Sequence, residues 1–141
     1  MGIGNSKVVI GPISREPLSI LMTTSSEIND RHIDLLDRLA VIGKRVAPET
    51  FFRLHQSQNE TYTVSKKDIY ICLDSVGSDY NTLYYVFLHE LTHCVATSSK
   101  HHDPIFSRTF QQLRMTAIHL GILDERKHVQ NEIFCGTTVS Y

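Results

Sequence analysis

The chain has 141 residues, 41% of them hydrophobic, which suits one globular domain because a chain of this length buries roughly two-thirds of the surface that its unfolded form exposes. Its formal net charge of -1 at pH 7 excludes a general attraction to nucleic acid or anionic membrane, so contact with either would need a local patch. Apolar stretches are too short or too interrupted for a membrane span or a secretory signal, and we expect a cytoplasmic or nuclear protein.

Residues 1–23 are expected to form an N-terminal segment ahead of a single domain over residues 24–141. The segment begins with a match to M-G-x-x-x-[ST], the pattern for myristoylation, which makes Gly2 a candidate acylation site. One acyl chain would give only weak, reversible membrane association. An unmodified, flexible terminus is the alternative.

A short strand is expected at Val8–Ile10, and the first helix follows it. Thr24 and Glu27 have the spacing of a capping box at the start of that helix. Pro48 disfavours helix at the residue before it, so the helix should end there. One face carries residues at alternating steps of four and three: Ile28, His32, Leu35, Leu39, Ile42 and Val46. On this face we interpret His32 as a packed core histidine rather than a ligand.

Short runs that favour β-structure follow between residues 51 and 74, separated by polar turn residues. The runs are 51–54, 61–64 and 69–73. Together they predict a small antiparallel meander.

Two further helices are expected in the second half of the chain. Residues 82–96 are apolar almost all round, which predicts a largely buried helix, with Asn81 or Asp79 as its cap. Asp103-Pro104 then signals a new helix, with aspartate as N-cap and proline at the first helical position. Gly121 is a natural stop for that helix.

The buried helix contains the pattern H-E-x-x-H at residues 89–93. Side chains four residues apart share one helical face, so His89 and His93 can converge on one zinc ion. Zinc lowers the pKa of a bound water and polarises a carbonyl group, and Glu90 is placed to act as the general base. The chain has 8 histidines, which favours accidental matches, but two histidines and a glutamate in so apolar a helix would be costly without a shared partner.

A catalytic zinc usually has three protein ligands and one open position, so a third ligand is needed. Metzincins would have glycine at position 96 and histidine at position 99, where this chain has Ala96 and Ser99. No acidic residue lies between Asp103 and Asp124, which leaves out a thermolysin-like glutamate. The adjacent residues His101 and His102 are the candidates.

The motif H-E-L-T-H at 89–93, followed after eight residues by H-D-P-I-F at 102–106, resembles the signature of WLM-type, SprT-like minimal zinc metallopeptidases. The hydrophobic run 69–73 fits the same layout, and the closing F-C-G at 134–136 is similar to the Y-C-G ending of WLM-like proteins of large DNA viruses. The resemblance covers roughly residues 68–136. It implies a small zincin with a gluzincin-like layout, located in the host cell or the virion.

The resemblance also implies roles for single residues. His102 would be the third zinc ligand, with His101 as its competitor. Asp103 would cap the next helix, and Phe106 would anchor that helix against the metal helix, the buried helix that carries His89 and His93. Asp103 can instead be an outer acceptor for a ligand histidine.

Other cysteines, histidines and tyrosines could also bind metal or take part in catalysis, and the sequence leads to an expectation for each group. The cysteines Cys72, Cys94 and Cys135 lack the paired spacing of a zinc knuckle and are expected to be reduced thiols. The histidines His119 and His128 are expected at the surface or in packing. Three tyrosines are candidate oxyanion donors, with nothing in the spacing to select one: Tyr84, Tyr85 and Tyr141.

The sequence therefore predicts an α+β minimal zincin with a leading helix, a small mostly antiparallel sheet, the metal helix and a following helix. The expected activity is Zn2+-dependent hydrolysis of peptide bonds in a protein or peptide. The resemblance implies substrates that are DNA-linked or conjugated to ubiquitin-family proteins, with nucleic acid contacted indirectly or through a local patch. The alternative is a non-catalytic, zinc-stabilised module of a virion or adaptor, with membrane association through Gly2.

Overall fold

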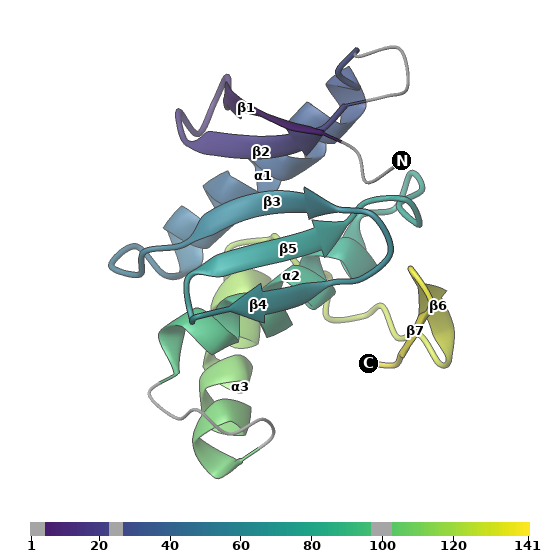
Figure 1. The fold of residues 1–141 in the computed structure, drawn as a ribbon. Coiled ribbons are helices and arrows are strands. Elements are labelled where there is room, and N and C mark those ends of the chain that lie inside the picture. Colours follow the sequence, from purple (N-terminus) through teal and green to yellow (C-terminus); the bar gives the residue numbers. More distant parts are fainter. Residues whose placement is uncertain (1–4, 23–26, 97–102) are drawn as a thin grey trace.

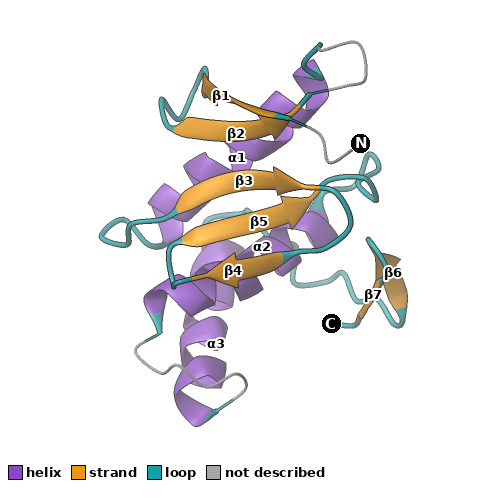
Figure 2. Ribbon diagram, viewed as in Figure 1, coloured by secondary structure: helices purple, strands orange, loops and turns teal. Residues whose placement is uncertain are grey.

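The structure is a computed structural model that describes residues 5–22, 27–96 and 103–141. Gly2, Thr24, His101 and His102 therefore lie outside the described residues. Within the described ranges the chain forms three helices, a five-stranded sheet and a two-stranded hairpin (Figure 2). This is the α+β class that the sequence predicts.

The five-stranded sheet is mixed rather than mostly antiparallel. Its strands are β1 (Ser6–Ile10), β2 (Pro17–Leu21), β3 (Arg53–Ser57), β4 (Tyr62–Val64) and β5 (Asp68–Cys72). They lie in the order β1-β2-β3-β5-β4. The pairs β1–β2 and β5–β4 are antiparallel, whereas β2–β3 and β3–β5 are parallel. The expected N-terminal segment thus supplies the first two strands.

The predicted antiparallel meander is wrong in its strand order. β3 pairs in parallel with β5, and β4 lies beyond β5 at the edge of the sheet. The reason is burial: β5 contributes Ile69 and Ile71, both fully buried, whereas β4 carries the exposed side chains of Tyr62 and Val64. The more apolar strand takes the interior position, and the shorter, polar one is left at the edge.

All three helices lie on one side of the sheet, behind it in Figure 1. They are α1 (Asp30–Val46), α2 (Asn81–Val95) and α3 (Pro104–His119). The hydrophobic core fills the space between them and the sheet, and its fully buried members include Leu18, Ile20, Leu35, Leu39, Ile69, Ile71, Phe87, Leu88 and Leu91. The other face of the sheet carries no helix among the described elements.

The helix ends agree with the sequence except at the start of α1 and at the cap of α2. The predicted capping box is wrong there: Asn29 is the N-cap, and its side chain accepts hydrogen bonds from the N–H groups of Arg31 and His32. The side chain of Asn29 offers the same kind of hydrogen-bond acceptor as that of a threonine, and it lies directly before the first turn of the helix. The end of α1 at Val46, before Pro48, is confirmed.

Both later helices start near the predicted positions. α2 begins at Asn81, but the prediction of Asn81 or Asp79 as its cap is wrong: the N-cap is Tyr80, which makes no side-chain capping hydrogen bond. Asp79 lies one residue too early for the N-cap, and its carboxylate accepts the N–H of Asn81 at 3.0 Å. α3 begins at Pro104 after the N-cap Asp103, as predicted, and ends at His119. Gly121 follows with a φ of 77°, a conformation that glycine adopts without cost.

The tail of the chain forms a hairpin of β6 (Glu132–Phe134) and β7 (Thr137–Val139). A disulfide between Cys72 and Cys135 joins this hairpin to the end of β5, so the prediction of reduced thiols is wrong for these two residues. The two cysteines are 63 residues apart in sequence, and spacing alone cannot show that the fold brings them together. Cys94 is a free thiol, as predicted, and burial raises its pKa to about 12.

Candidate metal centre

Helix α2 places the histidines of the H-E-x-x-H motif one turn apart on one face. Both imidazoles are half-buried, and their ring centroids are 5.6 Å apart. Two imidazoles that bind one tetrahedral zinc at about 2.0–2.1 Å have ring centroids roughly 5 Å apart. The spacing of His89 and His93 therefore fits a shared zinc ion after a small rotation of the side chains.

Glu90 lies between the two histidines in sequence, and its side chain is buried, with 8% of the residue exposed. The hydroxyl of Thr63, on β4, donates a hydrogen bond to Oε1 of Glu90 at 2.8 Å. Burial raises the pKa of the Glu90 carboxyl, and the hydrogen bond from Thr63 partly offsets that rise. A buried carboxylate whose pKa is raised accepts a proton more readily than an exposed one, as a general base must.

Helix α3 supplies an aromatic wall beside the histidines. Phe106 is 2% exposed, and its ring centroid lies 4.6 Å from that of His93 and 5.2 Å from that of His89. Phe110 adds a second ring, 5.4 Å from His89. The N-cap Asp103 holds the start of this helix by accepting the N–H of Phe106 at 2.8 Å. The roles that the resemblance implies for Asp103 and Phe106 agree with these contacts.

A cavity of about 260 Å³ opens beside the motif. α2 lines one side with Tyr85, Val86, His89 and Glu90, and Thr61 lines another just before β4. The third side is the tail: Phe134 and residues 137–140. The hairpin that the disulfide ties to β5 is thus a wall of the cavity.

The three candidate tyrosines differ in their relation to this cavity. Tyr85 lines it. Tyr141 stacks on Tyr85 at 4.5 Å, and its hydroxyl forms hydrogen bonds with Asn81 and Thr82. Tyr84 instead lines a separate hollow next to Arg38. Of the three candidate oxyanion donors, Tyr85 is therefore the one that lines the cavity beside the motif.

The structure does not describe the residues that are predicted to supply the third zinc ligand. Within residues 5–22, 27–96 and 103–141, no three His, Cys, Asp or Glu side chains are grouped to hold a metal ion. His101 and His102 fall in the gap before Asp103. Of the predicted zinc ligands, the structure therefore describes only the two histidines on α2.

Histidines outside the motif have structural positions in the described part of the chain. His32 is half-buried, and its Nδ1 lies 2.9 Å from Nε2 of Gln56. His119 and His128 are exposed, as predicted. His55 lies 2.9 Å from Asp68, and the Arg53 guanidinium together with His55 holds the pKa of Asp68 far below its usual range.

The sequence analysis missed Thr63 and the tail hairpin as parts of the site. Thr63 lies 27 residues before Glu90, so no local pattern joins them. The sequence did contain one indication of Thr63, because side chains alternate between the two faces of a strand. If Tyr62 and Val64 face outward, Thr63 must face the helices.

Comparison with known proteins gives partial matches. The chain is 35% identical over 78 residues to the uncharacterized protein 136R of Invertebrate iridescent virus 6, covering 51% of this chain and 43% of that protein. It is 42% identical over 72 residues to the uncharacterized protein 042R of Invertebrate iridescent virus 3, covering 48% of this chain and 45% of that protein. The chain therefore spans less than half the length of both relatives. No family model and no solved structure matches it.

None of the helices in the described residues is long and apolar enough to span a membrane.

Proposed function

We propose that this protein is a zinc-dependent peptidase that hydrolyses peptide bonds in a protein or peptide substrate. The observation that carries the proposal is the buried carboxylate of Glu90, held by Thr63, on the same helix as two imidazoles whose separation fits one zinc ion. The resemblance to WLM-type, SprT-like metallopeptidases supports the same assignment.

His89 and His93 would hold the metal, with His102 as the third ligand and His101 as the alternative. When bound, zinc supplies Lewis acidity, which makes a coordinated water more acidic and polarises the scissile carbonyl. Phe106 packs against both described histidines and restricts their rotation. This packing would limit the orientations that the two imidazoles can adopt.

Glu90 is the general base of the proposed mechanism. Thr63 holds Oε1, and we assign Oε2 to the proton that the attacking water loses. The same oxygen then gives the proton to the amine that leaves. Because burial raises the pKa of this carboxyl, Glu90 accepts the proton of the water more readily than an exposed carboxylate would.

The cavity would determine where a substrate peptide lies relative to the motif. A peptide that enters it would lie between Thr61 and the tail segment 137–140, with Tyr85 near the motif. Tyr85 is our candidate for the donor to the oxyanion. DNA-linked proteins or ubiquitin-family conjugates are the substrates that the resemblance suggests, with nucleic acid contacted through a local patch.

The first test is bound metal measured by elemental analysis. We expect one equivalent of zinc in the wild type, loss of zinc in His93→Ala and in His102→Ala, and retention in His101→Ala. Glu90→Gln should keep the zinc and lose Zn2+-dependent cleavage of casein. Absence of zinc from the wild type would overturn the proposal. Zinc without any activity that depends on Glu90 would instead support a non-catalytic, zinc-stabilised module.

A further inference from the structure

Three aromatic rings stack across neighbouring strands on the face of the sheet that has no helix. They are His55 on β3, Tyr70 on β5 and Tyr62 on β4, and each is the register partner of the next. The centroids of His55 and Tyr70 are 4.3 Å apart, those of Tyr70 and Tyr62 are 4.9 Å apart, and the planes differ by 12° and 8°. We refer to these three residues as the aromatic ladder.

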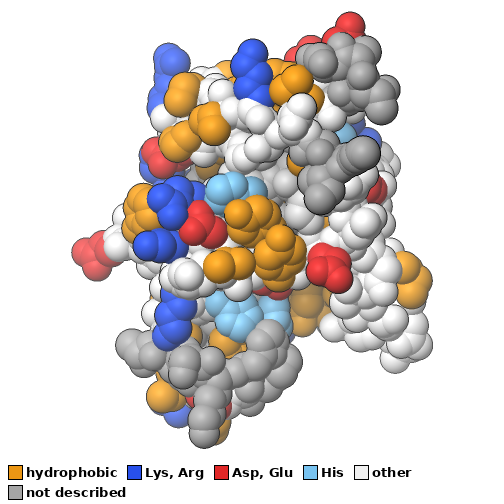
Figure 3. All heavy atoms as spheres, in the orientation of Figure 1, with side chains coloured by type: hydrophobic (Ala, Val, Ile, Leu, Met, Phe, Trp, Pro, Cys, Tyr) orange, Lys and Arg blue, Asp and Glu red, His pale blue; other side chains and the backbone are white. Residues whose placement is uncertain are grey.

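The ladder runs in the direction in which the strands pair. Its steps are close to the spacing of adjacent strands, about 4.7–4.9 Å, so each ring stands over its own strand with its plane facing the next strand. Tyr62 ends the ladder because β4 is the edge of the sheet. The residue is 41% exposed, and its outer ring face points to where a further strand would lie. Figure 3 shows hydrophobic side chains gathered on this face, with histidine side chains above and below them.

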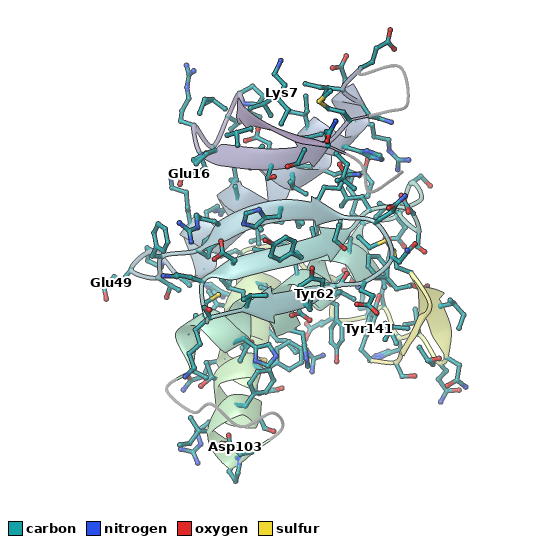
Figure 4. All side chains as sticks on the ribbon, in the orientation of Figure 1. Lys7, Glu16, Glu49, Tyr62, Asp103 and Tyr141 are labelled. Carbon is teal, nitrogen blue, oxygen red and sulfur yellow. A yellow bond between two sulfur atoms is a disulfide. The ribbon has the colours of Figure 1, made fainter. Side chains whose placement is uncertain are left out.

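The end of the ladder lies next to the candidate metal centre. Thr63, the residue after Tyr62, faces the helices and binds Glu90, and Thr61, the residue before it, lines the cavity that contains His89 and Glu90. Figure 4 labels Tyr62 on β4, at the lower edge of the sheet. Among the described strands β4 pairs with β5 alone, so no described strand pairs with its other edge, which lies beside the cavity.

We propose that the outer ring face of Tyr62 is a subsite for an aromatic side chain of an extended peptide that pairs with the free edge of β4. This inference rests on the proposed function, because the peptide is the substrate whose scissile bond lies at Glu90. A residue opposite Tyr62 would add the fourth ring to the ladder. Its neighbour in the peptide would face α2, the side on which Glu90 lies.

The surroundings favour a peptide over a nucleic acid as the occupant. A nucleobase can also stack on a tyrosine ring. However, the edge of β4 offers backbone groups that a peptide main chain satisfies and a sugar-phosphate chain does not. Arg53, which lies on the same strand as His55, forms a two-pronged hydrogen-bonded pair with Asp68, so its charge is already matched by a carboxylate.

The test is a binding measurement that does not require catalysis. We would use zinc-loaded Glu90→Gln protein and two fluorescent pools of short peptides, one with phenylalanine and one with alanine at a fixed central position. The remaining positions are randomised without aromatic residues. The phenylalanine pool should bind about two- to tenfold more tightly, the range measured for aromatic pairs. Tyr62→Thr should remove the preference, and Tyr62→Phe should keep it.

The control is Phe51→Thr, which removes a ring that is 63% exposed and lies outside the ladder, and it should keep the preference. Equal binding of both pools to protein with Tyr62 intact would overturn the inference, whatever the variants do. So would a single-stranded oligonucleotide that competes with the peptides in a Tyr62-dependent way. If the preference holds but wild-type protein cleaves neither pool, the subsite stands and the proposed function fails.

Discussion

Thr63 gives the buried carboxylate of Glu90 a neutral hydrogen-bond donor. A neutral donor orients the carboxylate without the large fall in pKa that a nearby cation would cause. The same hydroxyl also lies 3.2 Å from the main-chain oxygen of Glu90, so it connects strand β4 to α2 at the proposed base. Orientation of the base and packing of the edge strand thus depend on one side chain.

Thr63→Val should test that dependence. Valine keeps the shape of threonine and removes the donor, and a hydrogen bond to a charged group contributes about 1.5–3 kcal/mol. We expect kcat/KM for peptide cleavage to fall by roughly ten- to a hundredfold, while bound zinc stays at the wild-type level. Thr63→Ser, which keeps the hydroxyl, is the matched control. An unchanged kcat/KM in the valine variant would contradict the assigned role.

His32 makes a further prediction at the residue scale, on stability and pH. The carbonyl oxygen of Gln56 accepts the N–H of Leu21, so the amide nitrogen of Gln56 must be the group that faces Nδ1 of His32. Nδ1 therefore accepts a hydrogen bond in the folded state. Burial also lowers the pKa of His32 below its ordinary value of 6.5.

A lowered histidine pKa means that the unfolded state binds the proton more strongly than the folded state. The contribution of His32 to the free energy of unfolding is thus full above pH 6.5 and is lost as the pH falls through that value and below. His32→Gln should show a smaller loss of stability than wild type between about pH 7.5 and about pH 5.5 in urea unfolding. His119→Gln, at an exposed histidine, should behave as wild type. A loss in His32→Gln equal to that of wild type would refute the argument.

At the scale of elements, local patterns located the helices well. The spacing of apolar residues placed α1, and Asp103-Pro104 placed the start of α3 at the residue. The H-E-x-x-H core of the site was also visible, because a helix brings residues four apart together without help from the rest of the chain. The aromatic wall of Phe106 became visible only through a resemblance.

The order of the strands could not be predicted from local sequence patterns, because strand pairing depends on contacts between residues that are far apart in the chain. The hairpin of β4 and β5 turns through Ser65 and Lys66, both with positive φ, in place of the Asn-Gly pair that would signal such a turn. The pairing of β3 with β5 is decided by burial of the whole sheet. The same holds for Thr63 and for the tail hairpin, which reach the site from 27 residues before and more than 40 residues after Glu90.

The disulfide yields a prediction for the tail hairpin. It closes a loop over a sequence separation of 63 residues, for which the chain-entropy model gives about 4 kcal/mol of stabilisation. Cys72→Ala/Cys135→Ala should lower the free energy of unfolding by that order in urea titrations. Cys94→Ala, at the free thiol, serves as the control and should change it far less. Equal stability of the double variant and the wild type would show that the bond does not constrain the fold.

At the scale of the molecule, binding of metal and folding should be coupled. The proposed ligands His89 and His93 lie on α2, whose apolar residues belong to the central core, so an intact α2 is a condition for the proposed site. A ligand that binds only the folded state stabilises it by about 2.7 kcal/mol at a hundred times its Kd. Zinc should therefore raise the Tm measured by calorimetry, and a chelator should reverse the rise. His93→Ala should show no rise. A Tm unaffected by zinc in the wild type would argue against a folded-state site.

The position of all three helices behind one sheet leaves β4 as an element with two different tasks on its two faces. Tyr62 faces solvent and Thr63 faces Glu90, and the period of a strand keeps them on opposite sides. One residue inserted inside β4 would exchange the two faces, placing an aromatic ring against the base and the hydroxyl in solvent. Length changes among related sequences should therefore be tolerated between Ser57 and Thr61 and be excluded from the strand itself.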